Sequence, residues 1–136
     1  MDEALGHFIA GYISGEGSFY ISQPKSTLGQ MQCGFTLKVH ADDQELVEAV
    51  WLALGKAGRI YPPDVKRAAT VTLMIRSQNE LVNAVIPFFD QYPLRGKKRD
   101  HYDLWKQAVL MMWNNEHLTR AGWEAIAALK TRMNRS

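Results

Sequence analysis

The chain has 136 residues, which is enough for one hydrophobic core and too few for two independent ones. Hydrophobic residues make up 46% of the sequence and charged residues 22%, which excludes a disordered tail, while a net charge of +2 excludes no class of partner. A membrane-spanning helix needs about 20 apolar residues, and no such run exists. The acidic N-terminus is unlike a signal peptide. Cys33 has no second cysteine with which to form a disulfide.

We therefore expect one intracellular domain over residues 1–136, with neither a membrane nor a small molecule as its partner. A short helix is predicted from Leu5 to about Ser14, and the Gly-Glu-Gly segment after it is expected to end it. Two strands follow, over 18–22 and 32–40, in which apolar and polar side chains alternate. Alternation of this kind predicts strands with one buried face and one wet face.

The second half of the chain repeats this order. Its predicted elements are a helix to about Leu54 capped by 41–43, strands over 59–61 and 70–76, a helix that begins at Ser77 or Asn79 and is interrupted or ended by Pro87, and two helices over 96–113 and 120–133. The fold class is therefore predicted to be α+β, with helices on the buried face of a four-stranded antiparallel sheet whose polar face is outside.

Charge is unevenly distributed along the predicted elements. No acidic residue lies between Gly17 and Ala41, and between Arg59 and Asn79 the only acid is Asp64. The acids gather instead in predicted helices. This pattern favours one electropositive face on the sheet, although random scatter over short windows is the alternative.

The segment around Glu16 is the best candidate for chemistry. Ala10 and Ser14, like Gly11 and Gly15, are spaced four apart, and small side chains at this spacing let two helices approach closely. Glu16 follows at the C-terminal end of the helix, where the macrodipole disfavours a negative charge. A bound cation such as Mg²⁺ would neutralise both the carboxylate and nearby carbonyl oxygens. A solvated glutamate in a glycine-flanked turn is the other interpretation.

This segment, IAGYISGEG at residues 9–17, resembles the signature of the LAGLIDADG homing endonucleases. A second block, IPFFD at 86–90 with YPLRGKKR at 92–99, is similar to the region before the late helix of that family. The resemblance covers roughly residues 5–112. It implies an αββαββα fold whose sheet is a saddle over double-stranded DNA.

The resemblance further implies a metal-dependent DNA endonuclease, active as a homodimer because one chain carries one signature. Glu16 occupies the position of the metal-binding acid, the carbonyl of Gly15 is expected to complete that site, and Mg²⁺ is the expected metal, with Mn²⁺ or Ca²⁺ as substitutes. The basic residue that the family carries near its active site falls within residues 95–98 here, which implies Lys98, or Lys97 in the neighbouring register, as a catalytic cation. The residues implied at the dimer interface are Phe8, Ala10, Gly11 and Ser14. Dimer symmetry predicts a long pseudo-palindromic target.

Two positions depart from the family pattern. Ser14 stands where the family often has an earlier acid, although that position is not the usual direct metal ligand. Ala41 stands where many members carry a polar residue that organises the attacking water, with His40 beside it. Either His40 or other groups order that water, or activity is weak. The alternative functions are therefore a non-cleaving nucleic-acid-binding protein of the same fold, such as an RNA maturase or a DNA-binding regulator, and a plain dimerisation module, which the acid-free strands disfavour.

The polar sides of the strands are expected to read DNA bases, and loop cations are expected to contact phosphates. The predicted DNA-binding residues in or beside the strands are Ser18, Tyr20, Ser22, Gln32, Thr36, Lys38, His40, Arg59, Tyr61, Thr70, Thr72 and Arg76. Those in loops are Lys25, Lys66 and Arg67.

Overall fold

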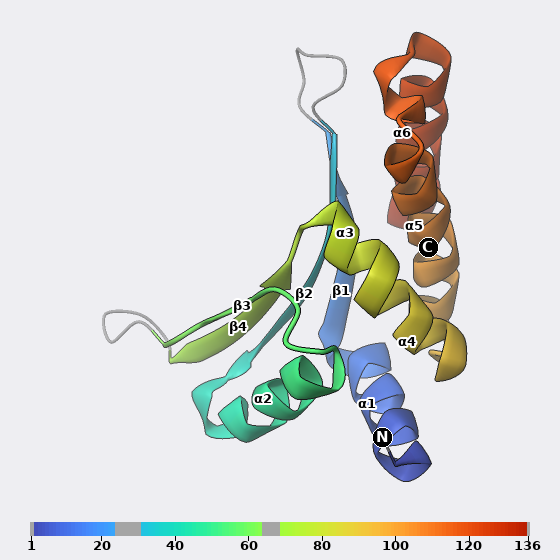
Figure 1. Ribbon diagram of the computed structural model, residues 1–136. Helices are drawn as coiled ribbons and strands as arrows, with labels where there is room; N and C mark the ends of the chain where they lie inside the picture. Colours follow the sequence, from blue (N-terminus) through green and yellow to red (C-terminus); the bar gives the residue numbers. More distant parts are fainter. Residues whose placement is uncertain (1, 24–30, 64–68, 136) are drawn as a thin grey trace.

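A computed structural model describes residues 2–23, 31–63 and 69–135 of the chain (Figure 1). Its elements are α1 (Glu3–Glu16), β1 (Gly17–Ser22), β2 (Gln32–His40), α2 (Gln44–Ala53), β3 (Arg59–Tyr61), β4 (Thr70–Ile75), α3 (Gln78–Glu80), α4 (Ile86–Gln91), α5 (Lys97–Trp113) and α6 (Arg120–Asn134). The predicted order of helices and strands is confirmed. Within these ranges, every helix is too short or too polar to cross a bilayer.

The four strands form one antiparallel sheet in the order β1-β2-β4-β3, which leaves β1 and β3 at the edges. Alternate residues of β2 and β4 are buried: Cys33, Phe35, Leu37, Val39, Val71, Leu73 and Ile75. Successive side chains of a strand point to opposite faces, so this pattern places the core on one side of the sheet. The predicted α+β class is confirmed, with α4, α5 and α6 beside the β1 half of the sheet and α2 beside β3 and β4 (Figure 1).

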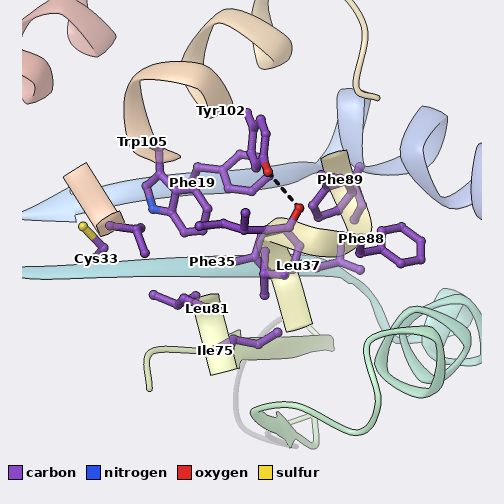
Figure 2. Close-up of a cluster of buried hydrophobic side chains, with 14 of the residues drawn as sticks. Phe19, Cys33, Phe35, Leu37, Ile75, Leu81, Phe88, Phe89, Tyr102 and Trp105 are labelled. Atoms are coloured by element: carbon purple, nitrogen blue, oxygen red, sulfur yellow. Dashed lines mark hydrogen bonds between the residues drawn. The ribbon is translucent and has the colours of Figure 1, made fainter. Parts of the chain in front are cut away.

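An aromatic cluster joins β1 to the helices that cover it (Figure 2). The ring of Phe19 lies with its centroid 4.8 Å from that of Trp105 and 5.2 Å from that of Phe35. Tyr102 packs against Phe19 at 5.3 Å and donates a hydrogen bond of 3.1 Å to the carbonyl oxygen of Ile86. Edge and tilted ring contacts of this kind fix the distance between α5 and the sheet. The start of α5 is thereby held beside the start of β1.

Helix α1 is two residues longer at each end than the sequence predicts. It begins at Glu3, because Asp2 caps it by accepting a hydrogen bond of 3.0 Å from the N–H of Ala4. It also runs through Gly15 and ends at Glu16, since Gly17 takes an extended conformation and enters β1 directly. The segment over residues 15–17 therefore ends the helix as predicted, but the end falls at Gly17, the C-cap, rather than after Ser14. As a consequence, Glu16 lies at the joint between helix and strand.

Two further segments have local structure that the sequence did not specify. A 3₁₀ turn over Ala41–Asp43 precedes α2, and His40 caps that turn through Nδ1, which accepts from the N–H of Asp42 at 3.1 Å. Of the two outcomes predicted at Pro87, interruption or termination of its helix, the structure shows interruption. A π-helical turn over Leu81–Val85 precedes Pro87, and α4 continues beyond this residue to Gln91. Proline removes one helical hydrogen bond, and widening the preceding turn accommodates that loss.

Candidate functional site

The junction between α1 and β1 presents a carboxylate to solvent. Glu16, the last residue of α1, is exposed, and the N–H of the next residue, Gly17, donates to the carbonyl of Ile13. A Cβ at position 17 would lie 2.6 Å from Cγ2 of Ile13, so glycine is required where the helix turns into the strand. The direction of the chain at Glu16 is therefore fixed by close packing directly behind it.

Lys98 approaches this junction from α5. Its Nζ donates a hydrogen bond to the carbonyl oxygen of Gly17, and the residue is half-buried. The neighbouring Lys97 is exposed. Of the two lysines, it is therefore Lys98 that contacts the α1–β1 junction, at the residue that follows Glu16.

A second contact attaches the loop before α5 to α1. The hydroxyl of Ser14 donates to the carbonyl of Ala10 at 2.7 Å and accepts from the N–H of Arg95 at 3.0 Å. The loop that leads to Lys98 is thus hydrogen-bonded to the helix that ends in Glu16. The sequence contained no signal for this contact, because its two partners are 81 residues apart.

The same contact corrects part of the expected dimer interface. Ala10 is only 2% exposed and Ser14 is bound within its own chain, so this pair of small residues faces the protomer's interior. The other pair faces outward: a Cβ added at Gly11 or at Gly15 would meet nothing within 4 Å. Phe8, one turn earlier, is 52% exposed. The surface of α1 that is open to a partner therefore includes Phe8, Gly11 and Gly15.

Negative charge collects on one flank of this helix. The hydroxyl of Tyr12 is buried and makes no hydrogen bond with any described residue. Burial raises the pKa of Tyr12, and the nearby carboxylates of Asp43 and Glu16 raise it further. The end of α1 thus combines carboxylate groups with the last-turn carbonyl of Gly15, which has no helical partner. Hard oxygen atoms of this kind suit Mg²⁺ or Ca²⁺.

This donor set is incomplete in a single chain. The described residues contain no group of three or more His, Cys, Asp or Glu side chains that could hold a metal ion. Magnesium prefers six oxygen ligands and usually keeps water and phosphate oxygens among them. Glu16 and Gly15 fit part of such a shell, and the remaining oxygens would have to come from water, a nucleic-acid phosphate or a second unit.

The end of β2 carries no polar side chain at the expected water-organising position. Ala41 offers only a methyl group, and its N–H is engaged with the carbonyl of Ala69 at 2.9 Å. His40 is exposed, but its Nδ1 is occupied by the cap on Asp42.

The outer face of the sheet is polar, as predicted. Cross-strand register aligns Ser18 with Thr36, Thr36 with Met74 and Met74 with Arg59 in one row. A second row contains Lys38, Thr72 and Tyr61, and the ends of the strands add the pairs Ser22 with Gln32 and His40 with Thr70. All these side chains are exposed or half-buried, and none is acidic. Met74 lies inside this surface and was not among the predicted DNA contacts, because its side chain is apolar.

Tyr20 lies across its neighbouring strand. A Cβ at the paired residue, Gly34, would fall 2.2 Å from the Tyr20 hydroxyl, so the ring occupies the space that any larger residue would fill. Burial raises the pKa of Tyr20, and the charge of Arg76 partly opposes this effect, which places the phenol near the guanidinium. The three predicted loop contacts, Lys25, Lys66 and Arg67, lie outside the described residues.

Comparisons with known proteins agree with this geometry. The sequence profile described as LAGLIDADG endonuclease matches residues 9–109. The chain is 29% identical over 125 residues to "Probable intron-encoded endonuclease 2" of Neurospora crassa, covering 92% of this chain and 26% of that protein. It is 32% identical over 126 residues to "Probable intron-encoded endonuclease 3" of the same organism, covering 90% and 23%.

Solved structures match almost the whole chain as well. The meganuclease I-SmaMI bound to uncleaved DNA in the presence of calcium ions superposes with a TM-score of 0.85 at 29% identity, covering 97% of this chain and 45% of that one. I-LtrWI bound to target DNA gives a TM-score of 0.83 at 33% identity, covering 94% and 43%. The chain thus spans less than half the length of these relatives. From its signature helix, its sheet and these matches, the chain belongs to the LAGLIDADG endonuclease family.

Proposed function

We propose that the chain, as a single domain over residues 1–136, forms one half of a site-specific endonuclease that hydrolyses both strands of DNA. The observation that carries the proposal is the junction of α1 and β1, where exposed Glu16 and the Lys98 contact to Gly17 lie beside the open surface of Phe8, Gly11 and Gly15. Through that surface two copies of the chain could associate, which would bring two such sites together.

Cutting two strands requires two phosphate sites, and one chain supplies one Glu16. A homodimer about α1 brings two copies of Glu16 together through one self-complementary contact. Its glycines allow the close approach of helix backbones that this arrangement needs. A twofold symmetric dimer would read a pseudo-palindromic target. The relatives' greater length supports the requirement for a second unit.

Within each site, the chain's own groups divide the work. The Glu16 carboxylate and the Gly15 carbonyl would hold a divalent cation, Mg²⁺ in the functional enzyme and Mn²⁺ or Ca²⁺ as substitutes. A bound divalent cation lowers the pKa of water and stabilises charge on a phosphate undergoing displacement. Lys98 adds a fixed positive charge, which favours the extra negative charge of the transition state.

The polar face of the sheet would bind the DNA duplex. Its arginine, lysine and glutamine side chains match the hydrogen-bonding edges of guanine and adenine in the major groove. Solved relatives are described as bound to DNA targets, which supports this partner. The intron-encoded names of curated relatives support an intracellular protein encoded within a mobile intron.

The test uses the insertion site of the genetic element that encodes the protein. The substrate is a DNA duplex in which the two host sequences that flank this element are joined directly, and cleavage of this duplex is measured. Wild-type protein with Mg²⁺ should cut both strands, and Glu16→Gln should bind the duplex without cutting it. Glu45→Gln, which removes an exposed carboxylate from the first turn of α2, serves as the matched control and should cut normally. Equal cleavage by Glu16→Gln and wild type would overturn the proposal.

The second candidate is a nucleic-acid-binding protein that does not cleave, either an RNA maturase or a DNA-binding regulator. The methyl group of Ala41 favours it, because this side chain offers no hydrogen-bonding group at the expected water-organising position, and Nδ1 of the neighbouring His40 is engaged by the N–H of Asp42. Tight binding of the duplex or of the intron RNA, with no cleavage by wild type in Mg²⁺ or Mn²⁺, would support this candidate over the nuclease.

A further inference from the structure

A groove runs along the edge of β1 that does not pair with β2, at the margin of the polar face already described. Strand β1 pairs with β2 on one side only, and its other side faces α5 and α6 (Figure 1). The groove has a volume of about 270 Å³. Its polar lining comes from Ser18 and Tyr20 of β1, His101 of α5, and Lys130 and Asn134 of α6.

Lys130 is unusual among the lysines of the described chain. It is half-buried, yet its ammonium group makes no hydrogen bond or ion pair with any described residue. The other half-buried lysines are engaged: Lys98 donates to the carbonyl of Gly17, and Lys106 lies 2.7 Å from the carboxylate of Asp90. Partial burial of a charge without a counter-charge is unfavourable. An anion entering the groove would therefore gain a strong partner.

The groove is also continuous with the proposed DNA surface. Ser18 and Tyr20 belong to the outward-facing set of β1, so the lysine stands beside the same strand whose polar side chains are proposed to contact bases. It lies beyond the edge of the sheet. Contacts at the margin of a nucleic-acid interface go mainly to phosphates, and a lysine binds phosphate as a point charge.

We propose that this groove is a binding site for a backbone phosphate of the DNA duplex, with Lys130 as the cation that pairs with it. The amide of Asn134 and the hydroxyl of Ser18 supply further hydrogen-bond donors from the two walls. The inference rests on the proposed function, since it requires that the chain bind DNA. It extends the interface from the strands to α6, which lies outside residues 9–109 matched by the family profile.

The test uses a mixed-sequence DNA duplex, because a phosphate contact does not depend on base sequence. The dissociation constant is measured over a series of KCl concentrations for wild type, Lys130→Gln and Lys106→Gln. Lys106→Gln removes the same charge from a lysine that is already paired within the chain. A thermal melt of each protein confirms that it is folded.

Each phosphate contact adds about 0.9 to the magnitude of the slope of log K against log salt. Lys130→Gln should therefore bind more weakly and with a slope shallower by about 1, whereas Lys106→Gln should match wild type. A folded Lys130→Gln with an unchanged slope overturns the phosphate site while leaving DNA binding intact. If wild type itself shows no salt-dependent binding to duplex DNA, the proposed function fails, and the phosphate site fails with it.

Discussion

Lys98 donates a hydrogen bond from Nζ to the carbonyl oxygen of Gly17, a residue 81 positions earlier in the chain. Gly17 follows Glu16, so the contact holds a cation next to the exposed carboxylate. The aromatic packing of Tyr102 and Trp105, later in the same helix, fixes the position from which Lys98 reaches the junction. The position of this lysine is therefore a consequence of the core.

Replacing Lys98 with methionine, and separately Lys97, distinguishes the catalytic contributions of these two lysines. Methionine keeps the apolar part of the side chain and removes the charge, so we expect the kcat of Lys98→Met to fall by about 10²–10³, as for loss of a single transition-state donor, with little change in duplex affinity. Lys97→Met changes an exposed residue and should lower kcat much less. Single-turnover cleavage at saturating protein measures both. A greater loss of kcat for Lys97→Met than for Lys98→Met would show that Lys97, not Lys98, carries this role.

Ser14→Ala tests the link between α1 and the loop before α5. The substitution deprives the N–H of Arg95 of the Ser14 Oγ acceptor at 3.0 Å, and a hydrogen bond of this kind contributes about 1 kcal/mol. We expect the free energy of unfolding in urea to fall by about that amount. Ser22→Ala, on the exposed end of β1, should leave it nearly unchanged. Equal values for the two variants would show that this link adds no stability.

Two glycines with positive φ form a matched pair. Gly58 has φ of 76° and a Cβ there would lie 2.3 Å from the carbonyl oxygen of Met74, whereas Gly55 has φ of 69° with nothing within 4 Å. Gly55→Ala should cost only the backbone strain, about 1 kcal/mol, and Gly58→Ala about 3 kcal/mol because a steric clash is added. Urea unfolding of both variants measures the difference. Similar losses would contradict the close packing of β3 on β4.

Gly34→Ala should alter DNA recognition more than stability. The new methyl group would meet the flexible end of the Tyr20 side chain and push the ring off β2. We expect cleavage preferences to change at the base pairs that Tyr20 and Arg76 face, with unfolding free energy reduced by about 1 kcal/mol. Profiling cleavage on single-base variants of the target measures this, and Tyr20→Ala in the same background should recover the stability. An unchanged profile would argue against Tyr20 as a reading residue.

Cys33 predicts a pH dependence at the alkaline end. Burial raises the pKa of its thiol from 9.0 to about 12, so between these values the unfolded chain loses the proton and the folded chain keeps it. Stability from this group is complete below pH 9.0 and declines as the pH rises toward about 12. Buried tyrosines titrate in both proteins, so the gap in unfolding free energy between wild type and Cys33→Ala isolates the thiol. As the pH rises, the unfolding free energy of wild type should fall relative to that of Cys33→Ala. A difference that does not change with pH would contradict the burial of the thiol.

Local sequence patterns predicted most of the fold. Alternation identified the buried side of β2, and the helices predicted over 96–113 and 120–133 match α5 and α6 within a residue. The error at the end of α1 falls where tertiary packing decides, since Gly15 remains helical because the close fit of Gly17 on Ile13 sets that end. Of the two outcomes predicted at Pro87, interruption is found because a wider turn precedes the proline.

The candidate site was predictable only in part. The signature motif located Glu16, but no local pattern could choose between Lys97 and Lys98, because that choice depends on how α5 packs against β1. Likewise, spacing alone gave Ala10 and Gly11 equal standing as interface residues. Burial separates them, because the interior side of α1 is determined by the residues of other elements that cover it.

The most direct test of the central claim mixes wild-type and Glu16→Gln chains carrying different affinity tags and isolates the mixed dimers. If each chain contributes one carboxylate to cleavage of one strand, the mixed dimer should nick a supercoiled plasmid that carries the target, with Mg²⁺, and should not linearise it. Linearisation by the mixed dimer at the wild-type rate, or full cleavage by a protein that remains monomeric on its duplex, would contradict the account.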